Sequence, residues 1–166
     1  MMETVTPKPG SSMERVANDA KRLGLEIELR VMDQSTRTAE EAAAACGCEV
    51  GQIVKSLVFE NADTGALVLL LVSGRHNADL DYISERYGLN LKRCDGRRVR
   101  EETGFAIGGV SPLGHKAPIA TWMDESLLDY DTVWAAAGRP DSVFRVGSRA
   151  LADTIGPEII AVRATD

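Results

Sequence analysis

The fold is decided by the stretch IVKSLVFENADTGALVLLLVS, which spans residues 53–73. Its two apolar runs, 53–59 and 66–73, are rich in Val, Leu and Ile, and the segment 61–65 between them has the composition of a turn. This pattern predicts a β-hairpin. Because both runs are almost continuously apolar, we expect the hairpin to lie in the middle of a sheet and to be covered on both faces.

Shorter elements surround the hairpin. Periodicity predicts helices over 13–23, 42–46, 79–87, 97–103 and 148–155, and strands over 26–31, 89–94, 119–123, 132–136, 143–146 and 158–162. Thr38 and Glu41 form a capping box that starts the second helix. The order has no strict βαβ rhythm and no internal repeat. We therefore expect an α/β (α+β) fold in a single domain, with one mixed, curled, barrel-like β-sheet and short helices around it.

Length and composition fit an ordinary globular domain. The chain has 166 residues, of which 44% are hydrophobic and 27% charged, and these values exclude disordered, collagen-like and membrane classes. Residues 1–12 predict a flexible lead-in, and residues 13–166 the domain itself. The apolar run 66–72 is far shorter than the roughly 20 residues of a membrane helix. Three cysteines, an odd number, favour a reducing compartment, so we expect a cytoplasmic protein without membrane contact.

The charge distribution is uneven. Nineteen basic residues against twenty-five acidic ones give a net charge of −6, which excludes a general polyanion binder and leaves only a local patch for nucleic acid. Between Arg86 and Arg100 lie six basic residues and a single acid, Asp95, and the run leads into a glycine-rich loop. This run is either a solvated face or a dock for a phosphate backbone. The candidate tRNA-binding residues are Arg93, Arg97, Arg98 and Lys116.

The glycine-rich loop, residues 104–114, is the most unusual segment of the chain. A Walker loop is excluded because His115 separates Gly114 from Lys116, and a nucleophile elbow is excluded because Leu113 stands where that motif requires glycine. The segment is either a structural turn or an oxyanion-type cradle. In a cradle, free backbone amides would point at a ligand oxygen, and the candidates are those of Gly109, Val110 and Ser111.

Two charged residues stand out within apolar surroundings. Lys55 interrupts the first run of the hairpin, so its ammonium either points into a cavity at an anion or carbonyl or reaches water at a strand end. Asp124 follows the strand 119–123 and either pairs with such a lysine or caps the next turn, with capping favoured. His76 and His115 are too isolated for a metal site. We predict neither a metal nor a cofactor.

Taken together, these features resemble the YbaK/EbsC family, which includes the editing domain associated with prolyl-tRNA synthetase. The resemblance runs from about residue 37 to 162. It is carried by Lys55 in its apolar strand, the loop 104–114, Asp124 with Ser126-Leu127, and the segment 137–139. It implies an α/β fold with a curled mixed sheet and hydrolysis of wrongly charged aminoacyl-tRNA. Such editing is needed because a pocket that selects by size gains only about 1 to 3 kcal/mol per methylene.

The resemblance also implies roles for individual residues. Lys55 would hold the substrate carbonyl or the terminal phosphate, and a water or a nucleophile on the substrate would attack the ester, without a protein general base. The implied catalytic residues are Lys55, Gly108, Gly109 and Ser111. The implied substrate-binding residues are Ser56, Val110, Pro112, Asp124 and Gly138. Alanine-specific relatives carry Asn at the position of Ser56 and His at the position of Ala137-Gly138, so cysteine, serine or threonine fits this chain at least as well as alanine.

The predicted function is therefore that of a trans-acting aminoacyl-tRNA deacylase of the Cys-, Ser/Thr- or Ala-tRNA class. Its partners would be the 3′ end of a mischarged tRNA and an aminoacyl-tRNA synthetase, and it would be a monomer or weak homodimer. Two alternatives remain open at this point. One is a non-catalytic module that binds an aminoacyl ligand, a nucleotide or a synthetase in the same pocket. The other is a hydrolase of free aminoacyl or peptidyl esters.

Overall fold

The computed structural model describes residues 3–33 and 38–164. Residues 1–2 of the expected lead-in, and residue 37 at which the family resemblance starts, lie outside that description. The helices are α1 (Ser12–Arg22), α2 (Ala39–Cys46), α3 (Leu80–Tyr87), α4 (Gly96–Thr103) and α5 (Ser148–Ile155), with short 3-10 turns at Val50–Gln52 and Glu125–Asp129. The strands are β1 (Glu3–Thr4), β2 (Glu28–Val31), β3 (Val54–Asn61), β4 (Leu67–Ser73), β5 (Leu91–Arg93), β6 (Ala120–Asp124), β7 (Thr132–Ala136), β8 (Ser142–Gly147) and β9 (Glu158–Ile160).

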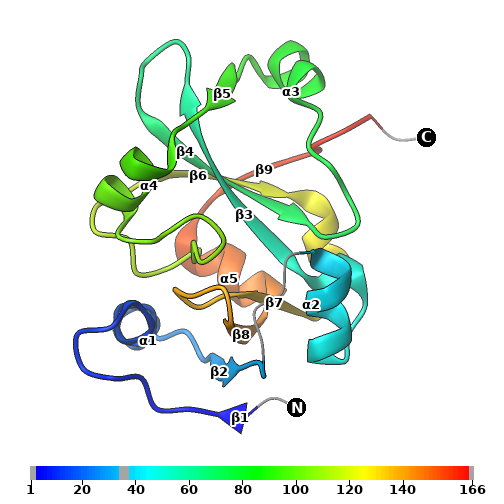
Figure 1. The fold of residues 1–166 in the computed structure, drawn as a ribbon. Coiled ribbons are helices and arrows are strands. Elements are labelled where there is room, and N and C mark those ends of the chain that lie inside the picture. Colours follow the sequence, from blue (N-terminus) through cyan, green and yellow to red (C-terminus); the bar gives the residue numbers. More distant parts are fainter. Residues whose placement is uncertain (1–2, 34–37, 165–166) are drawn as a thin grey trace.

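The predicted hairpin is present as β3 and β4, at the centre of a five-stranded mixed sheet in the order β5-β3-β4-β6-β9. Strands β4, β6 and β9 run parallel, whereas β3 is antiparallel to both of its neighbours. A second, four-stranded sheet has the order β1-β2-β8-β7 and is antiparallel throughout. Figure 1 shows this second sheet below the first, with α1 to its left.

The expectation of one curled, barrel-like sheet is corrected by this arrangement. The described residues form two sheets, and a single parallel bridge, between Ile53 and Trp134, links the start of β3 to β7. Beyond that bridge the two strands pair with other partners, so no closed barrel forms in the described part of the chain. The α/β class and the short surrounding helices are confirmed.

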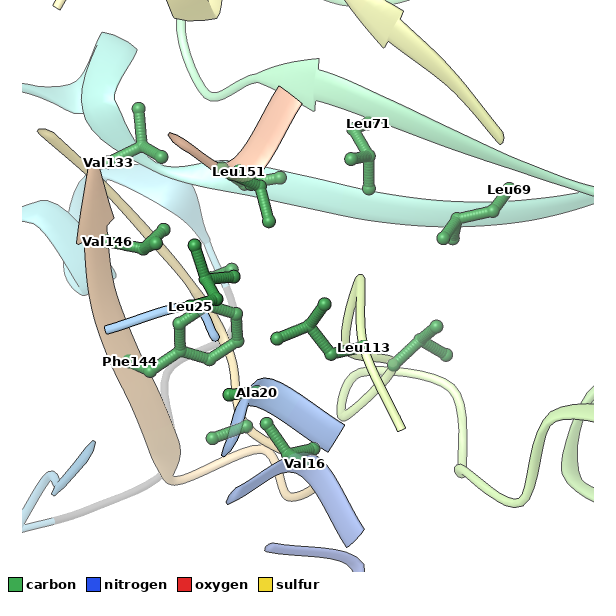
Figure 2. Close-up of a cluster of buried hydrophobic side chains, with 14 of the residues drawn as sticks. Val16, Ala20, Leu25, Leu69, Leu71, Leu113, Val133, Phe144, Val146 and Leu151 are labelled. Atoms are coloured by element: carbon green, nitrogen blue, oxygen red, sulfur yellow. The ribbon is translucent and has the colours of Figure 1, made fainter. Parts of the chain in front are cut away.

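Burial differs between the two strands of the hairpin. Every residue of β4 is buried, as expected, but in β3 only Val54 is buried and the rest are half-buried. The main core lies between the sheets, where Leu69 and Leu71 of β4 face Phe144 of β8, as Figure 2 shows. On the opposite face of β4, Leu70 packs with α3 in a separate apolar cluster. The prediction that both strands are covered on both faces is therefore confirmed for β4 and only partly for β3, where Val58 packs on one face and Leu57 and Phe59 on the other while staying half-buried.

Helix α1 supports the glycine-rich loop. The guanidinium of Arg15 donates to the carbonyl oxygens of Gly104 (2.5 Å) and Gly114 (3.3 Å) and lies 4.9 Å from the ring centre of Phe105. Gly114 has φ +78°, and a Cβ there would lie 2.9 Å from the backbone nitrogen of Val16. Only glycine allows this close approach of the loop to the helix.

The N-terminal residues are partly ordered by the second sheet. Glu3 and Thr4 pair with β2, and the hydroxyl of Ser11 caps α1 by accepting from the amide of Glu14. The division at residue 12 stays a prediction. The three cysteines are free and half-buried. None of the described helices has the length and apolarity that crossing a membrane would require.

Candidate functional site

A cavity of about 650 Å³ lies along the edge of β3 that faces β7. Strand β5 pairs only with Phe59, Glu60 and Asn61, so the preceding part of β3 has no strand on that side. The walls are mainly apolar and come from both sheets, from α2 and from the glycine-rich loop. They include Met32, Ala42, Ile53, Val58, Val110, Trp134 and Val143. The volume and the apolar walls are those of a small-ligand site.

The register of the hairpin determines which groups of β3 face this edge. The amide of Asn61 donates to Ala66 (2.8 Å) and that of Gly74 to Ile53 (2.7 Å), so the odd-numbered residues of β3 exchange hydrogen bonds with β4. The backbone groups of the even-numbered residues Ser56 and Val58 therefore point toward the open edge. The hydroxyl oxygen of Ser56 is buried and has no hydrogen-bond partner among the described residues. A buried hydroxyl without a partner is unfavourable unless a ligand supplies one.

Lys55 also borders the cavity, and its side chain is half-buried. Its ammonium donates a hydrogen bond to the backbone carbonyl of His76, in the turn that follows β4. Burial lowers the pKa of Lys55, and the negative charges of Glu40 and Asp124 oppose that shift. Of the two alternatives from the sequence, the structure agrees with the first, since Lys55 lines a cavity and its ammonium points at a carbonyl, although that carbonyl belongs to the protein.

Asp124 lies at the centre of a buried hydrogen-bond network, with only 1% of its surface exposed. One carboxylate oxygen accepts from the amide of Ser126 (2.9 Å), which confirms the capping prediction. The other accepts from the amide of Ser73 (3.0 Å) and lies 3.1 Å from Nδ1 of His76. Asp124 does not line the cavity. It fixes the turn whose carbonyl holds Lys55.

The glycine-rich loop contributes fewer residues to the cavity wall than expected. Gly108 and Val110 line the cavity, but Gly109, Ser111 and Pro112 do not. The amide of Gly109 donates to the carbonyl of Ala106 (3.0 Å), which corrects the prediction that this amide is free. The hydroxyl of Ser111 is fully buried and accepts from the amide of Leu113 (3.1 Å).

Close packing against α1 explains the glycine at position 138. It has φ +100° and lies away from the cavity, and a Cβ there would lie 2.7 Å from the Cβ of Ser12. Gly138 thus lets the turn after β7 approach the start of α1. Roles in catalysis or binding for Gly109, Ser111, Pro112, Asp124 and Gly138 stay predictions.

The predicted tRNA-binding residues fall into two groups. Arg98 is held by contacts within the protein, because it pairs with Glu60 and Glu102 and donates to the carbonyl of Gly65 (2.6 Å). Arg93, Arg97 and Lys116 are exposed and have no ion pair within residues 3–33 and 38–164. Of these three, only Arg93 lines the cavity.

Other lining residues were not anticipated. Trp134 and Ala135 lie on an apolar strand that gave no sign of a ligand site, because the sheet pairing alone brings them opposite β3. Ile107 and Pro140 lie at the exposed rim, and no local sequence signal marked either as a lining residue. No group of three or more His, Cys, Asp or Glu side chains able to hold a metal occurs in the described part of the chain.

Comparison with known protein families assigns the chain to one of them. The model of the aminoacyl-tRNA editing domain matches residues 33–154, which include the whole of β3, β4 and the glycine-rich loop. The chain belongs to the aminoacyl-tRNA editing domain family. The resemblance to the YbaK/EbsC group is confirmed. Helix α1, which supports the loop of this editing domain, lies outside the matched range.

Individual relatives agree with the family. The chain is 29% identical over 103 residues to EbsC of Enterococcus faecalis (strain ATCC 700802 / V583), named a “Putative Cys-tRNA(Pro)/Cys-tRNA(Cys) deacylase”, with 61% of this chain and 62% of that protein covered. It is 26% identical over 142 residues to YwhH of Bacillus subtilis (strain 168), covering 86% and 90%. A crystal structure described as that of “a putative trans-editing enzyme for prolyl tRNA synthetase” superposes with a TM-score of 0.84 and 41% identity, over 96% of this chain and 100% of the other.

Proposed function

We propose that this editing domain acts in trans as a hydrolase of the ester bond in mischarged tRNA, with cysteine, serine or threonine as the amino acid removed. The observation that carries the proposal is that Lys55 and the unpartnered hydroxyl of Ser56 both line one cavity whose walls are mainly apolar. The relatives named for Cys-tRNA deacylation and for trans-editing support the choice of reaction.

The cavity offers the chemical features that this reaction needs. Apolar walls such as Val110 and Trp134 exclude water from the reacting carbonyl and strengthen nearby electrostatic interactions. The ammonium of Lys55 balances negative charge on the substrate carbonyl or on the terminal phosphate. A water, or the substrate's own thiol or hydroxyl, attacks the carbonyl carbon. The bond from that carbon to the ribose oxygen then breaks, and the ribose oxygen takes up a proton.

The Ser56 hydroxyl supports a substrate whose side chain is small and polar. A site that hydrogen-bonds a substrate OH or SH group discriminates against an analogue that lacks the group, because the buried site group is then left unpaired. In the described structure, the Ser56 hydroxyl is buried and has no hydrogen-bond partner. Alanine provides no partner for it, whereas cysteine, serine and threonine do.

The test is deacylation of tRNAs charged with Ala, Cys, Ser or Thr by the wild-type protein and by Lys55→Ala. We expect hydrolysis of at least one polar amino acid ester, and a loss of about 10² to 10³-fold in Lys55→Ala, the size of effect seen when an oxyanion contact is removed. Lys21→Ala, which removes an exposed lysine from the last turn of α1, is the matched control and should behave as wild type.

Three outcomes would contradict the proposal. Full activity of a folded Lys55→Ala protein would show that Lys55 takes no part in the reaction. Binding of charged tRNA without hydrolysis of any of the four esters would instead identify a non-catalytic binding module. Hydrolysis of free aminoacyl esters at the same rate as charged tRNA, with no dependence on salt, would identify a hydrolase of small esters.

A further inference from the structure

Two of the three cysteines lie together at the end of α2. Cys46 is the last residue of the helix, Gly47 follows it in the left-handed conformation (φ +68°), and Cys48 comes next. A residue in a helical conformation of either hand keeps the Cα atoms on its two sides about 5.5 Å apart. Disulfides span Cα separations of roughly 4.4 to 6.8 Å. The backbone therefore holds Cys46 and Cys48 at a separation that a disulfide can bridge.

The two thiols also interact directly, because the Cys46 thiol donates a hydrogen bond to the Cys48 sulfur. This hydrogen bond lowers the pKa of Cys48, although burial and the negative charge of Glu49 oppose the shift. The same hydrogen bond raises the pKa of Cys46, and burial adds to that effect. Cys48 is thus the thiol that ionises first, beside a Cys46 that stays protonated.

The cysteine pair lies between solvent and the wall of the candidate site. Both residues are half-buried and line a second cavity of about 380 Å³, through which a small molecule can reach the sulfurs. On their inner side they pack against an apolar cluster, and most of its buried members line the candidate site. These shared residues are Met32, Ala42, Ile53, Trp134 and Val143. A bond between the two sulfurs would therefore move residues that support this wall.

We propose that Cys46 and Cys48 are a site of reversible oxidation by hydrogen peroxide. The Cys48 thiolate attacks one oxygen of the peroxide, the O–O bond breaks, and a sulfenic acid forms on Cys48 while the departing hydroxide takes up a proton. The Cys46 sulfur then attacks the Cys48 sulfur, the S–O bond breaks, and the thiol proton leaves with the hydroxyl group as water. In sum, two thiols are oxidised to one disulfide, and one peroxide is reduced to two waters.

The disulfide would act on the candidate site through α2. Closing the S–S bond draws the end of α2 toward residue 48 and displaces the wall, so deacylation should fall by about ten- to a hundredfold. Disulfides that are strained or exposed are readily reduced, and a thiol reductant should restore the activity. The oxidation itself is independent of the proposed function, whereas its effect on deacylation rests on that function.

Mass spectrometry and thiol titration test the site without a catalytic assay. After one equivalent of hydrogen peroxide, we expect the protein to lose two hydrogens and two thiols, both in the peptide that carries residues 46–48, and to regain them with dithiothreitol. Cys94 is the matched reference, because it is also free and half-buried but burial raises its pKa. Cys94→Ser should form the disulfide as wild type does. Cys46→Ser should stop at the sulfenic acid of Cys48, which dimedone traps.

Three results would overturn the oxidation site: oxidation of Cys94 as fast as Cys48, a disulfide that joins two molecules, or survival of both thiols at positions 46 and 48. Deacylation by the Cys94→Ser protein before and after oxidation measures the effect on the candidate site. Unchanged deacylation with the disulfide in place would show that the end of α2 does not control the wall. A protein that forms the disulfide but hydrolyses no ester in its reduced form would keep the oxidation site and overturn the deacylase function.

Discussion

Strands β3 and β4 have similar apolar sequences but different surroundings. Strand β4 is flanked by β3 and β6 along its length and packed on both faces, so all of its residues are buried. Strand β3 has β4 on one side, but on the other its first half faces the cavity. The comparison shows that apolar composition is sufficient to predict a strand near the core. Which edge of that strand remains open depends on residues far away in the sequence.

The largest expected difference between the strands is in core stability. Leu71 of β4 is fully buried between the sheets, and Leu71→Ala should lower the free energy of unfolding by about 2 to 5 kcal/mol. Val58 faces the same side from β3 but is half-buried beside the cavity, so Val58→Ala should cost about 1 kcal/mol. Urea denaturation of both variants measures the difference. Equal losses would show that the cavity side of β3 is packed as tightly as β4.

Local sequence signals predicted much of the fold. The turn residues between the two apolar runs gave the hairpin, and side-chain caps marked where helices begin. Thr38, for example, accepts from the amide of Glu41 at the start of α2, and Gly47 and Gly88 end α2 and α3 in the left-handed conformation. These signals act over a few residues, and so the sequence alone is enough to read them.

The open edge of β3 could not be predicted in the same way. It exists because β7 meets β3 only at the Ile53–Trp134 bridge and otherwise pairs with β8. The bridge joins segments that are about 80 residues apart in the sequence. The role of Asp124 shows the same limit. Its cap on Ser126 is local and was predicted, whereas its contacts with Ser73 and His76 come from the meeting of β4 and β6.

An intermediate effect is expected at the end of β4, where Asp124 of β6 accepts a hydrogen bond from the amide of Ser73. Asp124→Asn puts an amide NH₂ group where one carboxylate oxygen accepts a hydrogen bond, so the free energy of unfolding should fall by about 1.5 to 3 kcal/mol. Deacylation by the folded variant should also fall, because the His76 carbonyl that holds Lys55 is less firmly placed. Urea denaturation and single-turnover deacylation measure the two effects.

Asp129→Asn is the matched control for that change. Its carboxylate pairs with Arg75 at 3.0 Å on the surface, with 63% of the side chain exposed, and such pairs contribute no more than about 1 kcal/mol. The control should keep full deacylation. Equal behaviour of the two variants would show that the buried contacts of Asp124 hold neither the end of β4 nor Lys55.

The smallest expected change in stability has the opposite sign and lies on the open edge of β3. Ser56→Ala removes a buried hydroxyl that has no partner in the described structure, so the free energy of unfolding should stay constant or rise by up to about 1 kcal/mol. Ser142→Ala is the matched control, since Ser142 lines the same cavity but accepts from the amide of Arg139 (3.0 Å), and its loss should be destabilising by about 1 kcal/mol.

The same substitution separates stability from specificity. If the Ser56 hydroxyl pairs with the substrate side chain, Ser56→Ala should lower kcat/KM for Ser- and Cys-tRNA while that for Ala-tRNA changes little, because alanine offers no hydrogen bond to lose. Deacylation of the three charged tRNAs by a variant at least as stable as wild type measures this directly. A loss of stability in Ser56→Ala would mean that the hydroxyl has a partner within the protein. Equal losses of kcat/KM for all three amino acids would mean that the Ser56 hydroxyl does not recognise the side chain of the substrate. Strand β3 would then differ from β4 in exposure alone.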